Sequence, residues 1–252
     1  MVLISKVSKR YRKDKPLAVS DLTLEIASGE IFGFLGPNGA GKSTTINMMV
    51  GKIAQDQGTI LIDGHDTLKD ALEAKKIVGY VPDEPRLYEK MTGRRYLDFI
   101  CDVFFIGDER DEQIVHWASR FNLEEALDDQ ISSYSRGMKQ KLGIISALVH
   151  RPKILILDEP MVGLDPKSAF VLKEVMRELC NEGGTVFFST HVMEVAERVC
   201  DRVGIIHNGT LVAHGPFAQL REAQGEMGAT LEQLFLELTD EHQESVIADE
   251  SR

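Results

Sequence analysis

The chain has 252 residues, of which 43% are hydrophobic and 27% charged, and its formal net charge is −11 at pH 7. This is the ordinary balance of a globular protein, with enough chain for one large domain or two small ones. The negative charge argues against nonspecific binding to nucleic acid or to an anionic membrane surface. No apolar run approaches the length of a membrane span. The three cysteines lack C-x-x-C spacing and the first residues lack the apolar core of a signal peptide, so we interpret the cysteines as reduced core thiols of a cytosolic protein.

The first third of the chain is predicted to be rich in β-strands. Alternation of apolar and polar side chains indicates a strand with one exposed face, whereas an unbroken apolar run indicates a buried strand. One apolar run leads into a glycine-rich stretch that is followed by a helical pattern. The strands are predicted within residues 2–35, with 22–26 and 31–35 as the clearest, and at residues 59–62 and 78–81, and the helix at residues 44–50.

The glycine-rich stretch fits G-x-x-x-x-G-K-[ST], a loop that binds nucleotide phosphates. Its glycines let the backbone curl so that successive N–H groups face an anion, and the N-terminus of the following helix also attracts anions. We expect Lys42 to reach the β- and γ-phosphates and Ser43 to ligate Mg²⁺. The alternative is a glycine-rich turn with an unrelated lysine. The nucleotide-binding candidates are Gly36, Pro37, Asn38, Gly39, Ala40, Gly41, Lys42, Ser43 and Thr44.

The middle of the chain changes to helical periodicity. Residues 92–150 are predicted to form a helical insert between strands, and one helix face is predicted to hold Tyr96, Phe99, Ile100, Val103 and Phe104. Beyond the insert, strands and helices alternate again. The later elements are a helix with Leu172, Val175, Met176 and Leu179 on one face, a buried strand at residues 185–189, a hairpin over residues 204–212, a helix at residues 230–238 and a polar, frayed end at residues 240–252.

A second candidate site follows the insert. Residues 154–157 form an apolar run without alternation, which predicts a strand buried on both faces in a parallel sheet. The run ends in Asp158 and Glu159, and ligands of α/β folds bind at the carboxyl ends of such strands. We expect Asp158 to hold Mg²⁺ through water and Glu159 to polarise an attacking water. The alternative is a strand end followed by an acidic turn.

The segment Tyr134-Ser135-Arg136-Gly137-Met138 lies between the insert and the acidic strand. This segment, the helical insert and the two nucleotide motifs together resemble the ATP-binding subunit of an ABC transporter. The resemblance covers roughly residues 2–220. The family's signature there is L-S-G-G-Q, of which Ser135 and Gly137 match. The resemblance implies that these two residues meet the γ-phosphate held by a partner's phosphate loop. The alternative for the pentapeptide alone is a serine helix cap.

The resemblance also implies roles for four isolated residues. Tyr11 corresponds to an aromatic residue that stacks on adenine, with an ordinary strand-end tyrosine as the alternative. Asp165 belongs to a loop through which two ATP sites communicate, although it could be only a helix N-cap. His191 resembles the switch histidine that contacts the γ-phosphate, the alternative being a structural histidine. Asp83 stands where the family has a glutamine that contacts Mg²⁺ and water, so it is a metal candidate whose alternative is to cap the turn after Pro82.

The implied fold is α/β: a P-loop NTPase core with a mostly parallel sheet, an N-terminal antiparallel β subdomain and a helical insert. Residues 1–239 are expected to form one ABC ATPase domain with its helical subdomain at about 84–150, and residues 240–252 a polar tail. The signature variant and the sequence of residues 230–238 resemble bacterial exporters of the ABC-2 type.

The implied function is an ATPase that dimerises around two Mg-ATP and drives a separate transmembrane permease. The second ATP-binding subunit is a copy or a paralogue, nucleic acid is not a partner, and the chain is cytoplasmic, peripheral on the inner face of the membrane. The permease is expected to dock near residues 83–105, with Leu87 and Tyr88 as contacts unless they pack internally. The rival functions are a soluble ABC ATPase acting on nucleic acid or ribosomes and a regulatory module that holds ATP without hydrolysing it.

Overall fold

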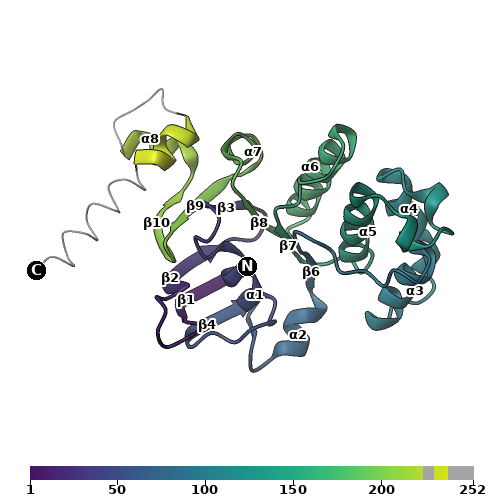
Figure 1. Ribbon diagram of the computed structural model, residues 1–252, viewed down its shortest axis with the longest axis horizontal. Helices are drawn as coiled ribbons and strands as arrows, with labels where there is room; N and C mark the ends of the chain where they lie inside the picture. Colours follow the sequence, from purple (N-terminus) through teal and green to yellow (C-terminus); the bar gives the residue numbers. More distant parts are fainter. Residues whose placement is uncertain (224–229, 238–252) are drawn as a thin grey trace, which may run out of the picture.

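Two β-sheets lie against each other in the computed structural model, which describes residues 1–223 and 230–237 (Figure 1). The larger sheet has six strands in the order β10-β9-β3-β8-β7-β6 and the smaller has four in the order β2-β1-β4-β5. The larger sheet is built from β3 (Ile31–Leu35), β6 (Val78–Val81), β7 (Ile154–Asp158), β8 (Thr185–Thr190), β9 (Arg202–His207) and β10 (Thr210–Gly215).

The larger sheet is parallel except for the β9–β10 hairpin. Every residue of β3, β7 and β8 is buried, because helices cover one face of this sheet and the smaller sheet, with the helix after the phosphate loop, covers the other. This confirms the predicted parallel α/β core. All the parallel strands end at the same edge, where the phosphate loop and the acidic pair emerge.

The smaller sheet is antiparallel and packs one face onto the larger sheet. Its strands are β1 (Val2–Lys9), β2 (Val19–Ile26), β4 (Gln57–Ile62) and β5 (His65–Asp66). Alternating burial along β2 places Leu22, Leu24 and Ile26 in a core shared with Phe32 and Phe34 of β3. The predicted N-terminal antiparallel subdomain is therefore confirmed.

The helical insert gathers at one end of the molecule, as α3, α4 and α5 in Figure 1. Tyr96, Leu97 and Cys101 of α3 point into the insert's core, whereas Phe99 and Val103 are exposed. The residues predicted to share one helix face therefore differ in burial, because the apolar stripe of α3 is wider than the face that α4 and α5 cover. The insert comprises α3 (Gly93–Val103), α4 (Arg110–Arg120), the 3₁₀ turns Glu124–Ala126 and Ile131–Ser133, and α5 (Arg136–Leu148).

The remaining helices flank the sheets. The last described helix spans residues 231–237, and its Leu231 and Leu234 are fully buried against α7 and β9. The predicted end of this helix at Leu238 and the polar tail at 240–252 lie outside the described residues. The other helices are α1 (Lys42–Met49), α2 (Ala71–Lys76), α6 (Pro166–Asn181), α7 (Met193–Val199) and α8 (Phe217–Ala223).

The three cysteines carry free thiols, with Cys101 and Cys180 buried and Cys200 half-buried. Burial raises the pKa of each thiol, that of Cys180 to about 11, so the reactive thiolate is disfavoured. Within residues 1–223 and 230–237, no helix combines the length and apolarity needed to cross a membrane.

Candidate nucleotide site

The phosphate loop runs from the end of β3 into α1 along a path that requires glycine. A Cβ at Gly36 would lie 2.4 Å from the carbonyl oxygen of Ile206, and one at Gly41 would lie 2.6 Å from that of Ala18. Gly41 also has φ of 112°, in the region that favours glycine, and serves as the N-cap of α1. The backbone can therefore curl tightly between its neighbours, which leaves the loop's N–H groups and the helix N-terminus available to an anion.

Lys42 lies inside this loop. Its side chain is only 6% exposed, and its Nζ donates to the carbonyl oxygens of Gly36 at 2.6 Å and Pro37 at 3.2 Å. The same Nζ is 3.6 Å from Oε1 of Glu159. The phosphate loop and the acidic strand, which are more than a hundred residues apart in sequence, therefore meet at one cation. Phosphate oxygens are stronger acceptors for Lys42 than carbonyls are, because they carry charge.

The acidic strand presents Asp158 at its carboxyl end. The parallel register pairs Asp158 with Ser189 of β8, and the buried Ser189 hydroxyl donates to Oδ1 of Asp158 at 2.6 Å. Ser43 is exposed on the first turn of α1. A hydroxyl and a carboxylate are the hard oxygen ligands that Mg²⁺ takes, together with water and substrate phosphates. Across the described residues, no group of three or more His, Cys, Asp or Glu could hold a metal by itself.

Glu159 and His191 form a pair beside Lys42. Nδ1 of His191 lies 3.0 Å from Oε1 of Glu159, and the backbone N–H of Glu159 donates to the carbonyl oxygen of Ser189 at 3.2 Å. Glu159 has φ of 49°, an uncommon conformation for a residue with a side chain, which the surrounding strands hold in place. Its carboxylate is thereby aimed back across the sheet edge at Lys42 and His191.

Asp83 follows Pro82 directly after the end of β6. Partial burial raises its pKa, and the negative charges of Asp158 and Glu159 raise it further, whereas Arg136 acts in the opposite direction. The structure thus places Asp83 within electrostatic reach of the metal candidate Asp158, although the Asp83 side chain is largely exposed.

Tyr11 stands next to the phosphate-loop helix rather than in a strand. β1 ends at Lys9, and the Tyr11 ring is 58% exposed with its hydroxyl 3.4 Å from Oγ1 of Thr44. An exposed aromatic ring beside the first turn of α1 suits the base of a nucleotide whose phosphates lie in the loop.

The signature segment and the loop around Asp165 pack against each other. Ser135 caps α5, its Oγ accepting from the N–H of Met138 at 3.2 Å. A Cβ at Gly137 would lie 2.9 Å from the carbonyl oxygen of Gly163, so only glycine permits this contact. The serine cap that was the alternative for Ser135 is therefore present, and it leaves the hydroxyl at the exposed start of α5.

Asp165 is likewise a helix cap, since its Oδ1 accepts from the N–H of Ser168 at 2.9 Å at the start of α6. It has a second partner, because Nζ of Lys141 lies 2.8 Å from its Oδ2. Hydrogen bonds from Lys141 and Ser168 hold the pKa of Asp165 well below its usual range. The ion pair links α5 to the loop that precedes α6, so these two segments form one continuous surface.

A model of the ABC transporter family matches residues 19–162. The chain belongs to the ABC transporter family. It is 34% identical over 228 residues to the ABC transporter ATP-binding protein NatA of Bacillus subtilis (strain 168), an alignment that covers 89% of this chain and 93% of NatA.

Solved structures of ABC ATP-binding subunits are similar to this fold. One described as the ATP-binding subunit of an ABC transporter superimposes with a TM-score of 0.91 at 33% identity, covering 95% of this chain and 99% of that one. A dimeric, post-hydrolysis structure of the ATP-binding cassette MJ0796 bound to ADP and Pi superimposes with a TM-score of 0.78 at 25% identity, covering 86% of this chain and 98% of that one. The ABC ATPase fold and the nucleotide-binding character of this chain follow from these relations.

Sequence reasoning missed Ser189 and Lys141. Ser189 was noted only as the end of a buried strand, although a polar residue at the carboxyl end of a strand next to β7 is a signal for the site. Lys141 lies on α5 without a local pattern that points to Asp165. Neither the pairing of Asp158 with Ser189 nor that of Lys141 with Asp165 is local in sequence, so both depend on strand order and helix packing.

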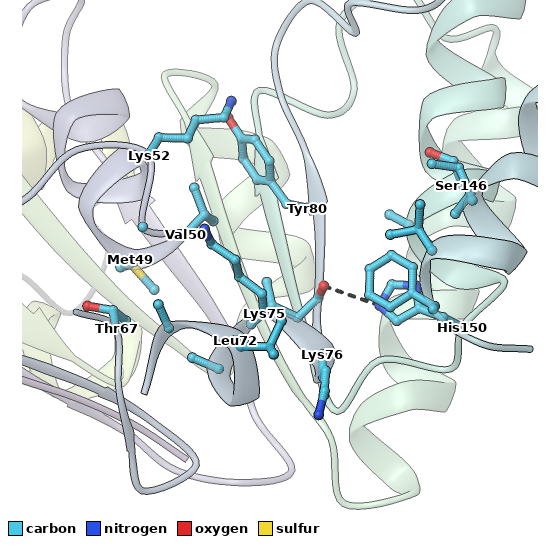
Figure 2. Close-up of a pocket in the computed structure, with 18 of the residues that line it drawn as sticks. Met49, Val50, Lys52, Thr67, Leu72, Lys75, Lys76, Tyr80, Ser146 and His150 are labelled. Carbon is cyan, nitrogen blue, oxygen red and sulfur yellow. Dashed lines mark hydrogen bonds between the residues drawn. The ribbon is translucent and has the colours of Figure 1, made fainter. Parts of the chain in front are cut away.

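A large groove lies away from this edge, between the core and the insert, and we call it the insert groove (Figure 2). Its volume is about 850 Å³. The core side is formed by the end of α1, α2 and β6, and the insert side by α3 and α5. Its lining residues are Met49, Val50, Gly51, Lys52, Thr67, Ala71, Leu72, Ala74, Lys75, Lys76, Val78, Tyr80, Tyr96, Ile100, Val103, Phe104, Phe105, Ser146, Ala147 and His150.

Proposed function

We propose that this chain is a Mg²⁺-dependent ATPase subunit that closes with a second ATP-binding subunit around two ATP molecules and drives a separate permease. The observation that carries the proposal is the convergence at Glu159, whose carboxylate lies 3.0 Å from His191 and 3.6 Å from Lys42. A carboxylate, an imidazole and a phosphate-binding ammonium at one strand edge are the groups that ATP hydrolysis requires.

In this proposal each residue has a separate task. Lys42 and the loop N–H groups hold the phosphates, and Tyr11 stacks on adenine. Ser43 and Asp158 hold Mg²⁺, with Asp83 as a further candidate, and the ion supplies charge neutralisation at the phosphates when it is bound. Ser189 fixes the Asp158 carboxylate through their 2.6 Å hydrogen bond.

The chemical step then depends on Glu159 and His191. Glu159 accepts a proton from the attacking water, and His191 holds the Glu159 carboxylate in position and contacts the γ-phosphate. Phosphoryl transfer needs positioning and charge stabilisation more than covalent chemistry. The left-handed backbone of Glu159 serves that positioning.

One chain carries one phosphate loop and one signature segment, which supports a two-subunit site. Ser135 and Gly137 would meet the γ-phosphate held by the partner's loop, and Asp165 would lie between the two sites. Support comes from the packing of Gly137 on Gly163 and from the dimeric structure to which this fold is similar. The second subunit is a copy of this chain or a paralogue.

The membrane partner is proposed to dock at the insert groove. Exposed aromatic rings gather on the insert beside it: Tyr88 is 59% exposed and makes an edge contact with Phe99, with ring centroids 5.8 Å apart. Leu87 packs partly into the insert's core. Through this docking the chain would lie on the inner face of the membrane, and the signature variant with Met138 supports export as the direction.

Hydrolysis by the purified chain tests the proposal. We expect Mg²⁺-dependent release of phosphate from ATP, a loss of at least 100-fold in kcat for Glu159→Gln, and loss of ATP binding for Lys42→Ala. A regulatory module would bind ATP without turnover in the wild type. Stimulation by DNA or ribosomes, rather than by a co-purified permease in vesicles, would favour the soluble ABC ATPases.

A further inference from the structure

The last described helix, residues 231–237, is too short to be stable by itself. Isolated helices of fewer than about 12 residues are marginal in water, so this helix depends on what it packs against. Its start is nevertheless well specified. The Thr230 N–H donates to Oε1 of Gln233 at 2.8 Å, and the Gln233 N–H donates to Oγ1 of Thr230 at 3.3 Å. This reciprocal pair is a capping box, so the sequence itself specifies a helix that begins here.

The 231–237 helix packs on two segments of the nucleotide-binding core. Leu231 and Leu234 are three residues apart, so they lie on the same face of the helix, and both are fully buried. Their hydrophobic cluster contains Leu35 of β3, which directly precedes the phosphate loop, and Ala196 and Met193 of α7. One short helix therefore supports both β3 and α7.

β3 has strong support of its own. Leu35 is paired in parallel register on both sides, with Thr190 of β8 and with Ile205 of β9. Beyond the strand, Lys42 is held by hydrogen bonds to the carbonyl oxygens of the phosphate loop. We therefore expect the phosphate loop to keep its place when the 231–237 helix is removed.

α7 has less support. It has seven residues, and no side chain caps its start at Val192. Ala196 and Val199 are its buried residues, and Ala196 lies in the cluster that the 231–237 helix completes. Without that helix, α7 would lose the packing on one of its two buried side chains. Short helices with few buried contacts open at the lowest free energy, so α7 is the segment that we expect to move.

The position of α7 determines where His191 lies. His191 connects the end of β8 to the start of α7, and the Val192 N–H donates to Oγ1 of Thr190 at 3.0 Å. The His191 ring is half exposed, and its one polar contact among the described residues is with Oε1 of Glu159, at 3.0 Å. A single contact on an exposed ring is lost when the backbone that carries the ring shifts.

We propose that the 231–237 helix positions His191 for ATP hydrolysis, and that Leu231 and Leu234 are the positioning residues because they hold α7 in place. The inference rests on the proposed ATPase function and adds a distant control on its chemical step. Without the helix, α7 shifts or frays and the His191 ring leaves Glu159. ATP binding is retained, because the phosphate loop does not depend on α7.

Steady-state ATP hydrolysis by the purified chain tests the proposal. Leu231→Ala with Leu234→Ala is expected to lower kcat about tenfold or more, since a misplacement of about 1 Å can cost about 100-fold. The Kd for a fluorescent ATP analogue should not change. Leu24→Ala removes a buried leucine of β2 from a cluster that contains no residue of α7, so this matched control should keep the wild-type kcat. Methionine at positions 231 and 234, which nearly restores the lost volume, should restore kcat.

Two further measurements separate positioning from a general loss of stability. In a His191→Ala background the leucine variants should cause no further loss of kcat, because the residue that they position is absent. Hydrogen exchange followed by mass spectrometry should be faster over residues 191–199 in the leucine variants than in Leu24→Ala, and equal over residues 42–49. A general loss of stability would accelerate exchange in both segments. Leu234→Ala alone replaces the double variant if urea unfolding shows that the double variant is not folded.

The outcomes distinguish this inference from the proposed function. Unchanged kcat in the leucine variants, the same further loss in the His191→Ala background, or unchanged exchange over residues 191–199 overturns the positioning role, while hydrolysis by the wild type stands. A wild type that binds ATP without hydrolysing it overturns the proposed function and the catalytic role of the 231–237 helix. The exchange over residues 191–199 then still decides whether this helix orders α7.

Discussion

Replacing His150 with glutamine should make the stability of this protein less dependent on pH. His150 lies on the wall of the insert groove, stacked on Phe104, and its Nε2–H donates to the carbonyl oxygen of Val78 at 3.2 Å. Its Nδ1 is buried and has no hydrogen-bond partner among the residues that the structure describes. Burial lowers the pKa of His150 from 6.5 to about 4, because the charged ring would be poorly solvated.

The sign follows from where the protons bind. Between pH 6.5 and 4 the unfolded chain protonates His150 and the folded protein does not, so folding stability falls as the pH falls through this window. The full difference corresponds to roughly 3 kcal/mol. At pH 5.5, about one unit below the unfolded pKa, roughly 1.4 kcal/mol of it should be lost relative to pH 7.5.

Urea unfolding at pH 7.5 and 5.5 measures this loss. Carboxylates also titrate near this range, so the informative quantity is the loss in the wild type minus the loss in His150→Gln. We expect the wild type to lose about 1.4 kcal/mol more than the variant. His116→Gln, which removes an exposed histidine of α4, serves as the matched control and should behave as the wild type. Equal losses in the wild type and His150→Gln would refute a neutral, buried His150 on the groove wall.

Three further changes probe the nucleotide site. Asp83→Asn should weaken Mg²⁺ affinity in the ATP-bound state more than metal-free ATP binding, and superimposable Mg²⁺ titrations of ATPase rate would mean that Asp83 has no role at the metal. Gly41→Ala should cost about 1–3 kcal/mol through its left-handed backbone and should abolish binding of a fluorescent ATP analogue, whereas retained binding would show that the loop can adjust. Lys141→Met should raise the pKa of Asp165 toward its usual range, so protonation of this carboxylate by acid should cost the variant less folding stability than it costs the wild type. An NMR titration that shows the same Asp165 pKa in both proteins would mean that the hydrogen bonds from Ser168 alone keep this pKa low.

Much of the fold could be predicted because its patterns are local. The apolar run before the phosphate loop and the one before Asp158 each became a fully buried parallel strand, β3 and β7. The strand at Val78–Val81 ended where Pro82 predicted. These elements are specified by their own side chains and by breakers next to them, so no knowledge of tertiary contacts was needed.

The rest depended on packing between distant segments. Phe99 and Val103 have the spacing of a buried helix face, but only the positions of α4 and α5 decide which part of α3 is covered. The contact between Lys42 and Glu159 joins residues far apart in sequence and required the strand order. The insert groove had no sequence signal, because it is a space between the core and the insert rather than a property of either.

ATP-dependent dimerisation of Glu159→Gln tests the central claim most directly. Removing the carboxylate that is proposed to prepare the water should stop hydrolysis while leaving the phosphate contacts proposed for Lys42 intact, so closed dimers should accumulate. Light scattering after size-exclusion chromatography, with and without ATP, measures the mass, and Lys42→Ala in the same background serves as the control. We predict a dimer for Glu159→Gln only when ATP is present, and a monomer for the control. A Glu159→Gln protein that binds ATP but remains monomeric at high concentration would contradict a nucleotide site shared between two subunits.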